Sequence, residues 1–450
     1  MTDFNISVPP QVQAVVERLN DRGFSAYAVG GCVRDSLLGT EPKDWDITTS
    51  ATACETKNAF PDYAVIETGI EHGTVSVIIE GKPYEVTTFR TEGGYSDNRH
   101  PDFVEFVSDV KEDLSRRDFT VNAMAYDCKN NRLIDLFGGA RDIENRVIRC
   151  VGNPELRFKE DGLRILRGLR FAAVLGFSVE PETALAMKRC KGLLKNISAE
   201  RVFSELKQTL CGREAESVLR EFREVFAEII PELKPMFDFP QNNPYHCYDV
   251  WEHTLHSLSA VPEEADLRFT MLFHDMGKPQ THSEERKENG EIIDHFYSHE
   301  KISEQSAREV LARLKSDKEL RHTVALLVNN HGIDIQPSRR IIKRRLNRFG
   351  EEILRKLITV KRADAAAQSL LCRRERLKQL DEVEGLLNEI IAEDECFSIK
   401  NLAIDGNDVI ALGFSGRDVG VILNKTVDEV INENLKNEKY EIIKYIISNF

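Results

Sequence analysis

Two short stretches near the start of the chain decide how its fold is interpreted: Gly-Gly-Cys-Val-Arg-Asp at 30–35 and Asp-Trp-Asp at 44–46. A β-strand sends alternate side chains to opposite faces. We therefore expect Asp44 and Asp46 to converge on one face, with Trp45 turned to the opposite, buried face. Two converging carboxylates form an oxygen-ligand site for Mg²⁺, the ion that accompanies phosphate chemistry.

Neighbouring residues extend this predicted site. The paired glycines Gly30 and Gly31 let the backbone approach a triphosphate closely, and Arg34 can neutralise part of its charge. Two-metal phosphoryl transfer usually needs a third carboxylate. Glu85 is the candidate, because it lies on a strand-like segment that could run beside the aspartates. The alternative is that Glu85 is an ordinary exposed strand residue.

Composition limits the class of protein. The 450 residues leave room for several domains, and 41% hydrophobic with 30% charged residues is typical of a soluble globular chain. No apolar run approaches the roughly 18 residues that span a bilayer, and the polar N-terminus does not resemble a signal peptide. The nine cysteines are scattered and include no Cys-x-x-Cys pair, which predicts neither a disulfide framework nor a zinc ribbon. We expect a cytoplasmic protein that does not associate with membranes.

The net charge of −14 hides a local pattern. Residues 336–378 hold 14 Lys/Arg against 4 Asp/Glu, whereas residues 379–450 hold 6 against 15. A local basic surface is what binding to a phosphate backbone requires, and a solvated helical face is the alternative. The candidate RNA-binding residues in the basic segment are Arg339, Arg340, Lys343, Arg344 and Arg345.

Periodicity predicts an α+β fold, with a small α/β head followed by an extended all-α body. Residues 91–101 are polar and rich in turn formers, so we expect a mobile loop there. We expect a helix at 11–20, strands at 26–29, 44–48, 74–79 and 84–90, and helices throughout 155–230, 245–332, 338–395 and 400–450.

A second motif is Leu-Ser-Arg-Arg-Asp-Phe-Thr-Val-Asn-Ala-Met at 114–124. The guanidinium forks of Arg116 and Arg117 suit a triphosphate. Asp118 and Asn122 are four residues apart, so they could share a helical face and hold ribose hydroxyls. The alternative is a surface ion pair between Arg116 and Asp118.

A third motif is Glu-Asp-Gly-Leu-Arg-Ile-Leu-Arg at 160–167. On a helix, Asp161 and Arg164 would be neighbours on one face. Side by side, they offer acceptors and donors that can match the Watson–Crick edge of a base. The alternative is an ordinary i,i+3 salt bridge.

Nine of the eleven histidines fall between His246 and His331. Imidazoles and carboxylates gathered on helices form a mixed N/O site for a divalent metal such as Mn²⁺, Ni²⁺ or Fe²⁺. The pattern resembles the HD-superfamily metal-dependent phosphohydrolases. The candidate ligands are His253, His274, Asp275, His299, His331 and Asp364.

The first three motifs, in this order, resemble those of the class II CCA-adding enzyme and bacterial poly(A) polymerase family over roughly residues 20–230. The resemblance implies a polymerase-β-like nucleotidyltransferase head, which we expect at 1–148. It also implies an all-α neck that recognises the nucleotide base at 149–235, an HD domain at 236–335, and a body and tail at 336–450 that bind tRNA. The oligomeric state is left open.

The same resemblance implies an activity. The enzyme would add C, C and A without a template to tRNA lacking its 3′ CCA, from CTP and ATP. Asp44 and Asp46 would bind Mg²⁺, Asp161 and Arg164 would read the incoming base, and Arg167 would belong to the nucleotide site. The HD domain would supply phosphatase or 2′,3′-cyclic phosphodiesterase activity, unless it is a metal-binding relic that only scaffolds the body.

Two further segments favour complete CCA addition within this family. Residues 87–101 resemble the flexible loop of enzymes that add all three nucleotides, and the acidic tail with Gly406, Gly413, Gly416 and Gly420 resembles that of CCA-adding enzymes. A poly(A) polymerase and a CC-only or A-only enzyme remain alternatives. From other classes, the alternatives are an HD phosphohydrolase whose head only holds nucleotide, and a non-catalytic RNA-binding protein.

Overall fold

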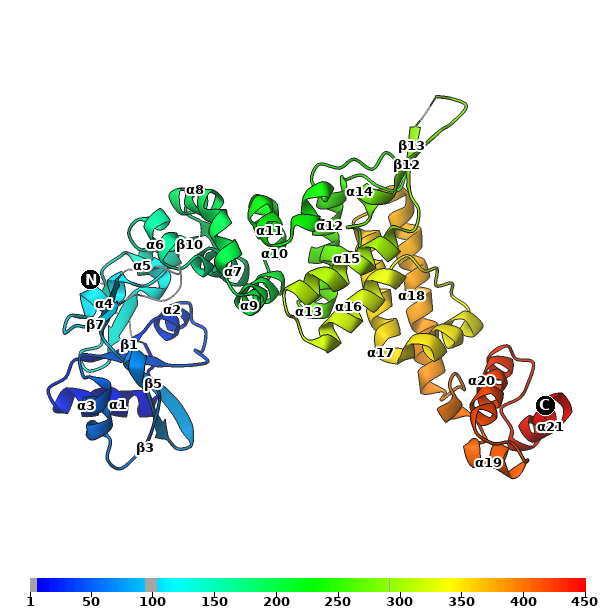
Figure 1. The fold of residues 1–450 in the computed structure, drawn as a ribbon, viewed down its shortest axis with the longest axis horizontal. Helices are drawn as coiled ribbons and strands as arrows, with labels where there is room; N and C mark the ends of the chain where they lie inside the picture. The colour runs from blue at the N-terminus through cyan, green and yellow to red at the C-terminus, as the bar shows by residue number, and fades with distance from the viewer. Residues whose placement is uncertain (1–5, 94–102, 291) are drawn as a thin grey trace. The chain divides into compact units, whose positions relative to one another are not determined.

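The computed structural model describes residues 6–93, 103–290 and 292–450, and the chain divides into two units, Met1–Pro231 and Glu232–Phe450 (Figure 1). The finer division of the chain into head, neck, HD domain, body and tail stays a prediction. Most of the loop expected at 91–101 lies outside the described residues. None of the described helices is long and apolar enough to cross a membrane.

The first unit is built on a seven-stranded sheet with the order β3-β4-β5-β2-β1-β8-β9. Two short strand pairs, β6 with β7 and β10 with β11, lie outside this sheet. The strands are β1 (Ala26–Val29), β2 (Asp46–Thr49), β3 (Ala64–Gly69), β4 (Thr74–Ile79), β5 (Lys82–Thr88), β6 (Arg90–Gly93), β7 (Phe103–Phe106), β8 (Met124–Asp127), β9 (Arg132–Asp135), β10 (Val147–Ile148) and β11 (Ser178–Val179).

Helices accompany this sheet and predominate after residue 150, so the helical prediction over 155–230 is confirmed apart from the short β11. The helices are α1 (Pro10–Asp21), α2 (Gly31–Leu37), α3 (Ala53–Ala59), α4 (Val110–Ser115), α5 (Gly139–Glu144), α6 (Pro154–Glu160), α7 (Leu163–Leu175), α8 (Pro181–Cys190), α9 (Ala199–Leu210), α10 (Ala215–Glu221) and α11 (Arg223–Ile229). Single 3-10 turns are η1 (Ile70–His72), η2 (Thr120–Asn122), η3 (Lys191–Asn196) and η4 (Pro231–Met236).

The register of the central strands carries the predicted site. Strands β2 and β5 run parallel, and Asp46 lies directly opposite Glu85. Directly opposed residues of neighbouring strands point to the same face. The strand begins at Asp46 rather than at the expected Asp44, and Trp45, which precedes it, is only half-buried. The expectation of a strand-interior Trp45 on a buried face was therefore wrong.

The second unit is mainly helical. Its helices are α12 (Val250–Ser259), α13 (Ala265–Phe273), α14 (Lys278–Thr281), α15 (His299–Arg313), α16 (Lys318–Asn330), α17 (Arg339–Ala366), α18 (Leu370–Ala392), α19 (Gly406–Ala411), α20 (Arg417–Ile431) and α21 (Lys439–Asn449), with a 3-10 turn η5 (Ile399–Asn401).

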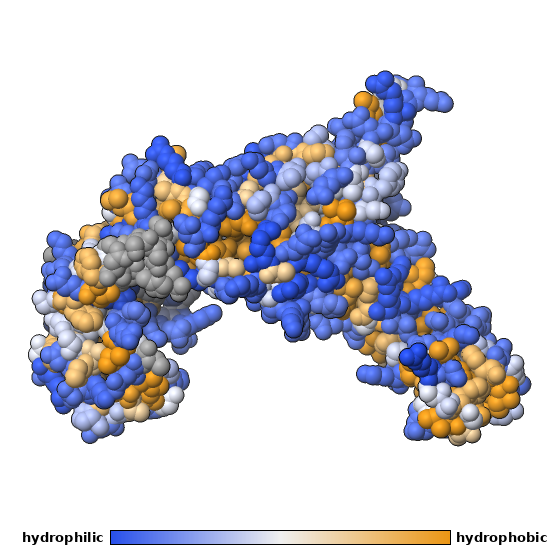
Figure 2. Space-filling model, viewed as in Figure 1, coloured by the Kyte–Doolittle hydropathy of each residue, from blue (hydrophilic) through white to orange (hydrophobic). Residues whose placement is uncertain are grey.

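A hairpin interrupts the helices at β12 (His282–Arg286) and β13 (Ile292–Phe296), so the prediction of continuous helix over 245–332 was wrong there. Every residue of β12 is exposed. A strand without a buried face has no alternating hydrophobic pattern, and the sequence therefore carries no periodic signal for it. Figure 2 shows this hairpin as largely hydrophilic on the face in view.

Helix α17 bends at Gly350, whose φ of 75° is in the left-handed region that favours glycine. The segment after the bend packs against α12 and carries Asp364. The predicted boundary between residues 335 and 336 would therefore separate α12 from the α17 segment that packs against it. A core of Ile342, Leu346, Leu354, Ile358, Val383, Leu387 and Ile390 joins α17 to α18.

Candidate active sites

The carboxylates of the first site gather at the edge where β2 and β5 begin to pair. Asp46 and Glu85 are opposite one another, and both are exposed. Partial burial, the charge of Glu85 and that of Asp44 together raise the pKa of Asp46, against the opposing charge of Arg117. Carboxylates that raise the pKa of a neighbouring carboxyl group by mutual repulsion are well suited to share a divalent cation.

Gly30 is required where it stands. Its φ is 82°, and a Cβ built on it would lie 2.9 Å from Arg117 Nη1. Gly31 begins helix α2. The guanidinium of Arg34 donates to Asp35 at 2.8 Å and to Asn122 at 2.6 Å. The structure thus places Arg34 as a bridge between segments of the first unit.

The two motif arginines are held by a residue that the sequence did not point out, Asp113. Its side chain is fully buried, and Arg116 donates to one of its oxygens from Nε and Nη2 at 3.0 and 2.8 Å. Arg117 Nη2 lies 3.5 Å from the other oxygen. Burial would raise the pKa of Asp113, but the two guanidinium groups hold it below its ordinary value. The alternative pairing of Arg116 with Asp118 is not what the structure shows.

Asp118 instead pairs with Arg167, at 2.8 Å from both Nε and Nη2. Asn122 donates to the same carboxylate at 3.4 Å, so the structure does bring Asp118 and Asn122 together. The expected helical face was wrong: Phe119 is extended and Thr120–Asn122 forms a 3-10 turn. Burial would raise the pKa of Asp118, but the charge of Arg167 keeps it below the ordinary value.

A cavity of about 290 Å³ collects the second and third motifs. Asp161 lies outside the helix, with a φ of −140°, so the expectation that it shares a helical face with Arg164 was wrong, although both residues line this cavity. The alternative i,i+3 salt bridge is not what the structure shows either. Arg164 pairs with Glu160, and Arg201 holds Asp161 at 2.8 Å. Arg201 was not predicted as a site residue, because it lies 40 residues further along the chain. Lining residues are Arg116, Arg117, Asp118, Asp161, Leu163, Arg164, Arg167 and Arg201.

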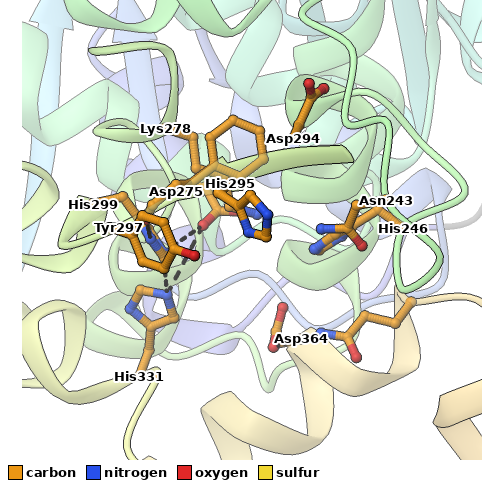
Figure 3. Close-up of a pocket in the computed structure, with 13 residues that line it drawn as sticks. Asn243, His246, Asp275, Lys278, Asp294, His295, Tyr297, His299, His331 and Asp364 are labelled. Carbon is orange, nitrogen blue, oxygen red and sulfur yellow. Dashed lines mark hydrogen bonds and ion pairs between the residues drawn. The ribbon is translucent and has the colours of Figure 1, made fainter. Parts of the chain in front are cut away.

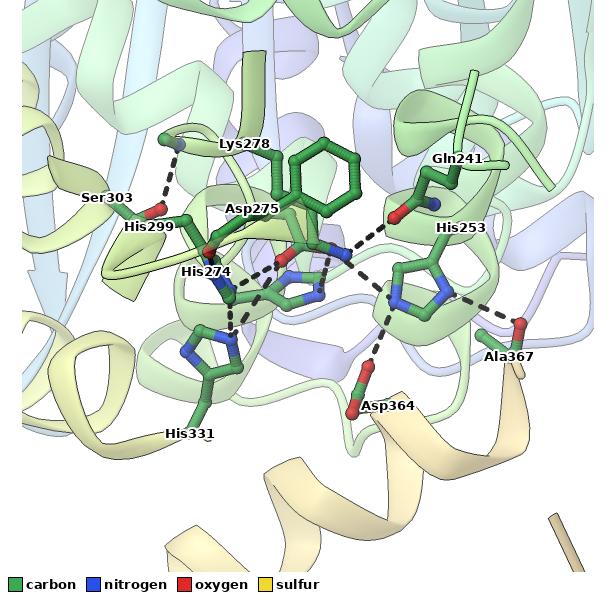
Figure 4. Close-up of polar contacts among 12 residues, drawn as sticks. Gln241, His253, His274, Asp275, Lys278, His299, Ser303, His331, Asp364 and Ala367 are labelled. Carbon is green, nitrogen blue, oxygen red and sulfur yellow. Dashed lines mark hydrogen bonds and ion pairs between the residues drawn. The ribbon is translucent and has the colours of Figure 1, made fainter. Parts of the chain in front are cut away.

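The second site lies in the second unit, where four histidines share one arrangement (Figure 4). Each donates from Nδ1 to a main-chain carbonyl, because a carbonyl oxygen can only accept. His274, His299 and His331 reach the carbonyl three residues earlier at 2.7 Å, and His253 reaches Ala367 at 3.3 Å. With the proton on Nδ1, the Nε2 atoms of His274, His299 and His331 carry the lone pair, as metal-binding histidines require. His253 Nε2 lies 2.9 Å from an Asp364 oxygen, with which it forms a hydrogen bond.

The four Nε2 atoms converge with two carboxylates. The Nε2 atoms of His299 and His331 lie 3.2 Å apart, although both carry lone pairs. His274 Nε2 is buried without a hydrogen-bond partner and lies 3.2 Å from an Asp275 oxygen. Such electron-rich atoms repel one another unless a cation lies between them, so the predicted ligands fit a metal.

The predicted ligands form two groups around Asp275. Within each group the candidate atoms lie within 4.8 Å of one another. The first group comprises His253, His274 and Asp364, and the second comprises Asp275, His299 and His331. Asp275 oxygens also lie 3.6 Å from His253 and 3.2 Å from His274. One carboxylate therefore faces both groups.

The pKa values of this site reflect burial and mutual charge. Burial lowers the pKa of His331 to about 3. For Asp275, the neighbouring His274 and the charge of Lys278 outweigh burial and hold the pKa well below its ordinary value. Lys278 was not predicted as a site residue, yet its buried Nζ lies 2.8 Å from Asp275 and 2.7 Å from Gln241.

The basic segment is partly neutralised by the acidic segment that follows it. Arg339 pairs with Glu389 and Glu393 at 2.7 Å and also with Glu395, and Lys343 is buried against Glu395. Lys343 is therefore not a surface cation, and we correct its assignment to an RNA-binding surface.

The other candidate RNA-binding arginines form no ion pair within the described part of the chain. Arg340 and Arg344 donate to Asn432, and Arg345 donates to the main-chain oxygen of Asp334.

Comparisons with known proteins agree with this architecture. Residues 26–149 match the family described as "Poly A polymerase head domain", and residues 286–446 match a tRNA nucleotidyltransferase domain 2. The chain is similar to the crystal structure of the Bacillus stearothermophilus CCA-adding enzyme in complex with CTP. That similarity has a TM-score of 0.71 and 27% identity, and it covers 98% of each chain.

Curated relatives are more similar over shorter spans. The CCA-adding enzyme of Ligilactobacillus salivarius is 45% identical over 245 residues, which is 52% of this chain and 60% of the relative. That of Lactococcus lactis subsp. cremoris is 42% identical over 284 residues, which is 60% of this chain and 69% of the relative. The chain thus spans about two thirds of the length of these relatives. It belongs to the CCA-adding enzyme family.

Proposed function

We propose that this chain adds C, C and A to the 3′ end of tRNA from CTP and ATP without a nucleic-acid template. The observation that carries the proposal is the in-register pair Asp46 and Glu85 on parallel strands. The two family matches that flank the neck and the similarity to a CTP-bound CCA-adding enzyme support it. The cavity of about 290 Å³ that Asp161 and Arg164 line would provide the surface that recognises the base.

In the proposed reaction, the tRNA 3′-hydroxyl attacks the α-phosphate of the nucleotide. A new P–O bond forms, the bond to the β-phosphate breaks, and pyrophosphate leaves. Mg²⁺ bound at Asp44, Asp46 and Glu85 would favour the deprotonated hydroxyl and neutralise charge on the phosphates. Arg116 and Arg117, oriented by Asp113, would hold the triphosphate. Asp161, oriented by Arg201, would contact the base together with Arg164.

The test uses tRNA that ends before CCA, with Mg²⁺ and CTP alone, ATP alone, or both. We expect two additions with CTP alone and a third when ATP is also present. Long A tails on unrelated RNA would indicate a poly(A) polymerase, and extension by CC or by A alone would indicate a partial enzyme. Asp46→Asn should abolish addition. Asp62→Asn is the matched control, because Asp62 is an exposed carboxylate of the same unit that pairs with Arg18.

A specific observation favours a second activity. We propose that the histidine site binds divalent metal and hydrolyses phosphate esters; His253, His274 and Asp364 would hold one ion, and Asp275, His299 and His331 would hold another. Support comes from the two three-residue ligand groups and from the lone pairs of His299 and His331 that face each other at 3.2 Å. Nitrogen-rich ligand sets favour Mn²⁺, Ni²⁺ or Fe²⁺ over Mg²⁺. When bound, such ions activate water for attack on phosphorus.

The experiment measures bound metal and hydrolysis of a 2′,3′-cyclic nucleotide. His331→Ala should lose metal and hydrolysis but keep nucleotide addition. His322→Ala, an exposed histidine on α16, is the matched control. Metal binding without hydrolysis would support the scaffold alternative. Hydrolysis without any nucleotide addition by the intact chain would support an HD phosphohydrolase whose head only holds nucleotide.

A further inference from the structure

Two cavities meet at the histidine site. The first, the metal cavity, has a volume of about 260 Å³ and is lined by Asp275 and His299 among others (Figure 3). The second, the side cavity, has a volume of about 310 Å³. His331, Gly332 and Asp364 line both. A ligand held at the metal cavity can therefore extend into the side cavity.

Two cations face the side cavity from α17 and α18. Lys361 Nζ donates to the main-chain oxygen of His331 at 3.2 Å, which fixes the ammonium at the shared wall. Arg376 donates to the side-chain oxygen of Gln368, and its guanidinium lies over the ring of Tyr245 at 5.5 Å. Both side chains are thus held in position beside the metal ligands.

Neither cation forms an ion pair within the part of the chain that the structure describes. Arg362, the next residue on α17, is different, because it forms ion pairs with Asp381 and Glu384 at 2.5 and 2.7 Å. Asp334 and Asp364 also line the side cavity, but neither forms an ion pair with Lys361 or Arg376 within the described residues. Two cations without an ion-pair partner at a cavity wall favour an anionic ligand.

The metal cavity is also lined by an aromatic surface. Tyr297 is 71% exposed. Its ring stacks on that of His295, with the centroids 5.2 Å apart and 9° between the planes. Figure 3 shows both rings at the edge of the cavity that contains Asp275. Exposed aromatic rings of this kind stack on unpaired nucleic-acid bases.

We propose that the histidine site takes the 3′ end of an RNA chain rather than a free nucleotide. The terminal phosphate lies at the metal ligands, the terminal base stacks on Tyr297, and the preceding phosphodiester binds Lys361 and Arg376. This inference rests on the proposed metal-dependent hydrolysis and names its substrate class. A mononucleotide lacks the group that Lys361 and Arg376 bind.

The kinetic test compares a 2′,3′-cyclic mononucleotide with a short oligoribonucleotide that ends in the same cyclic phosphate. In Lys361→Met/Arg376→Met, the preference in kcat/KM for the oligonucleotide should fall about tenfold or more, because two charge-assisted contacts are lost. Tyr297→Ala should lower kcat/KM for both substrates by a similar factor, because both carry the terminal base. Lys378→Met is the matched control, since Lys378 is a 79% exposed cation of α18 outside both cavities.

A binding measurement keeps the two proposals separable. Anisotropy of a 5′-labelled oligoribonucleotide with the Mn²⁺-loaded full chain should show tighter binding to a 3′-phosphate end than to a 3′-hydroxyl end. The double variant should reduce that difference about tenfold. If the wild type prefers the 3′-phosphate end but does not hydrolyse it, the hydrolase proposal fails, whereas the proposal of an RNA-binding subsite is supported. The subsite proposal would be overturned if the double variant lost kcat/KM equally for the mononucleotide and the oligonucleotide. It would also be overturned if the double variant bound the 3′-phosphate oligoribonucleotide as tightly as the wild type does, or if the wild type bound a phosphopeptide equally well.

Discussion

The buried carboxylate of Asp113 provides a quantitative test of how the first site is held. Removing one partner from a buried ion pair costs about 3–5 kcal/mol. Arg116 and Arg117 keep 17% and 21% of their side chains exposed, so water replaces part of the lost contact. We therefore take the lower end and expect Asp113→Asn to reduce the free energy of unfolding of the first unit by about 3 kcal/mol.

The pH dependence of this effect has a definite sign. Folding lowers the pKa of Asp113, because the two guanidinium groups outweigh its burial. The stabilisation is therefore fully present above the unfolded pKa of about 3.9 and is lost as the pH falls through the lower, folded value. We expect a constant difference between wild type and Asp113→Asn above about pH 5 and a narrowing difference below about pH 4.

The assay exploits the position of the two tryptophans, since Trp45 lies in the first unit and Trp251 in the second. Urea unfolding in a Trp251→Phe background reports the first unit through Trp45 alone. Asp62→Asn is the control, because Asp62 is 75% exposed in its pair with Arg18 and should change stability by less than about 0.5 kcal/mol. A loss below about 1 kcal/mol at pH 7, or a difference unchanged at pH 3, would refute the reasoning.

Three further outcomes are expected. Gly30→Ala should raise the KM for CTP and ATP about tenfold, because the new Cβ meets Arg117 at 2.9 Å; steady-state kinetics measure this. Lys343→Met should lower the stability of the second unit by about 2 kcal/mol and leave tRNA affinity unchanged, as Trp251 fluorescence and filter binding would show. Arg201→Met should release Asp161 and reduce the ratio of CTP to UTP incorporation about tenfold, measured by single-nucleotide extension.

Local patterns allowed much of the fold to be predicted. Strand β1 and the pairing of the Glu85 strand with the aspartate strand follow from short apolar runs and turn residues. The histidine cluster was also predicted, because imidazole clustering in a short window is visible in the sequence, and the structure brings these residues together. The hairpin at β12 and β13 was missed, since an exposed strand carries no hydrophobic alternation.

The site residues that were not predicted from the sequence were missed for a different reason. Asp113 and Arg201 act by holding other site residues, and each is an ordinary charged residue within a helical pattern. Lys343 was wrongly assigned to a binding surface, because a run of basic residues indicates such a surface only when no acidic segment packs against it. Partners distant in sequence become neighbours only through tertiary packing, which composition and spacing do not encode.

The carbonyl contacts of the histidines bear on how this family diverges. Three of the four rings are oriented by a carbonyl only three residues earlier in the chain, so each ligand is prepared by its own turn. The apolar core between α17 and α18 contains none of these ligands. The proposed metal centre would therefore be lost through a few point substitutions while the helical body persisted. Relatives with the same helical body would then differ in the proposed hydrolysis and still share the proposed nucleotide addition.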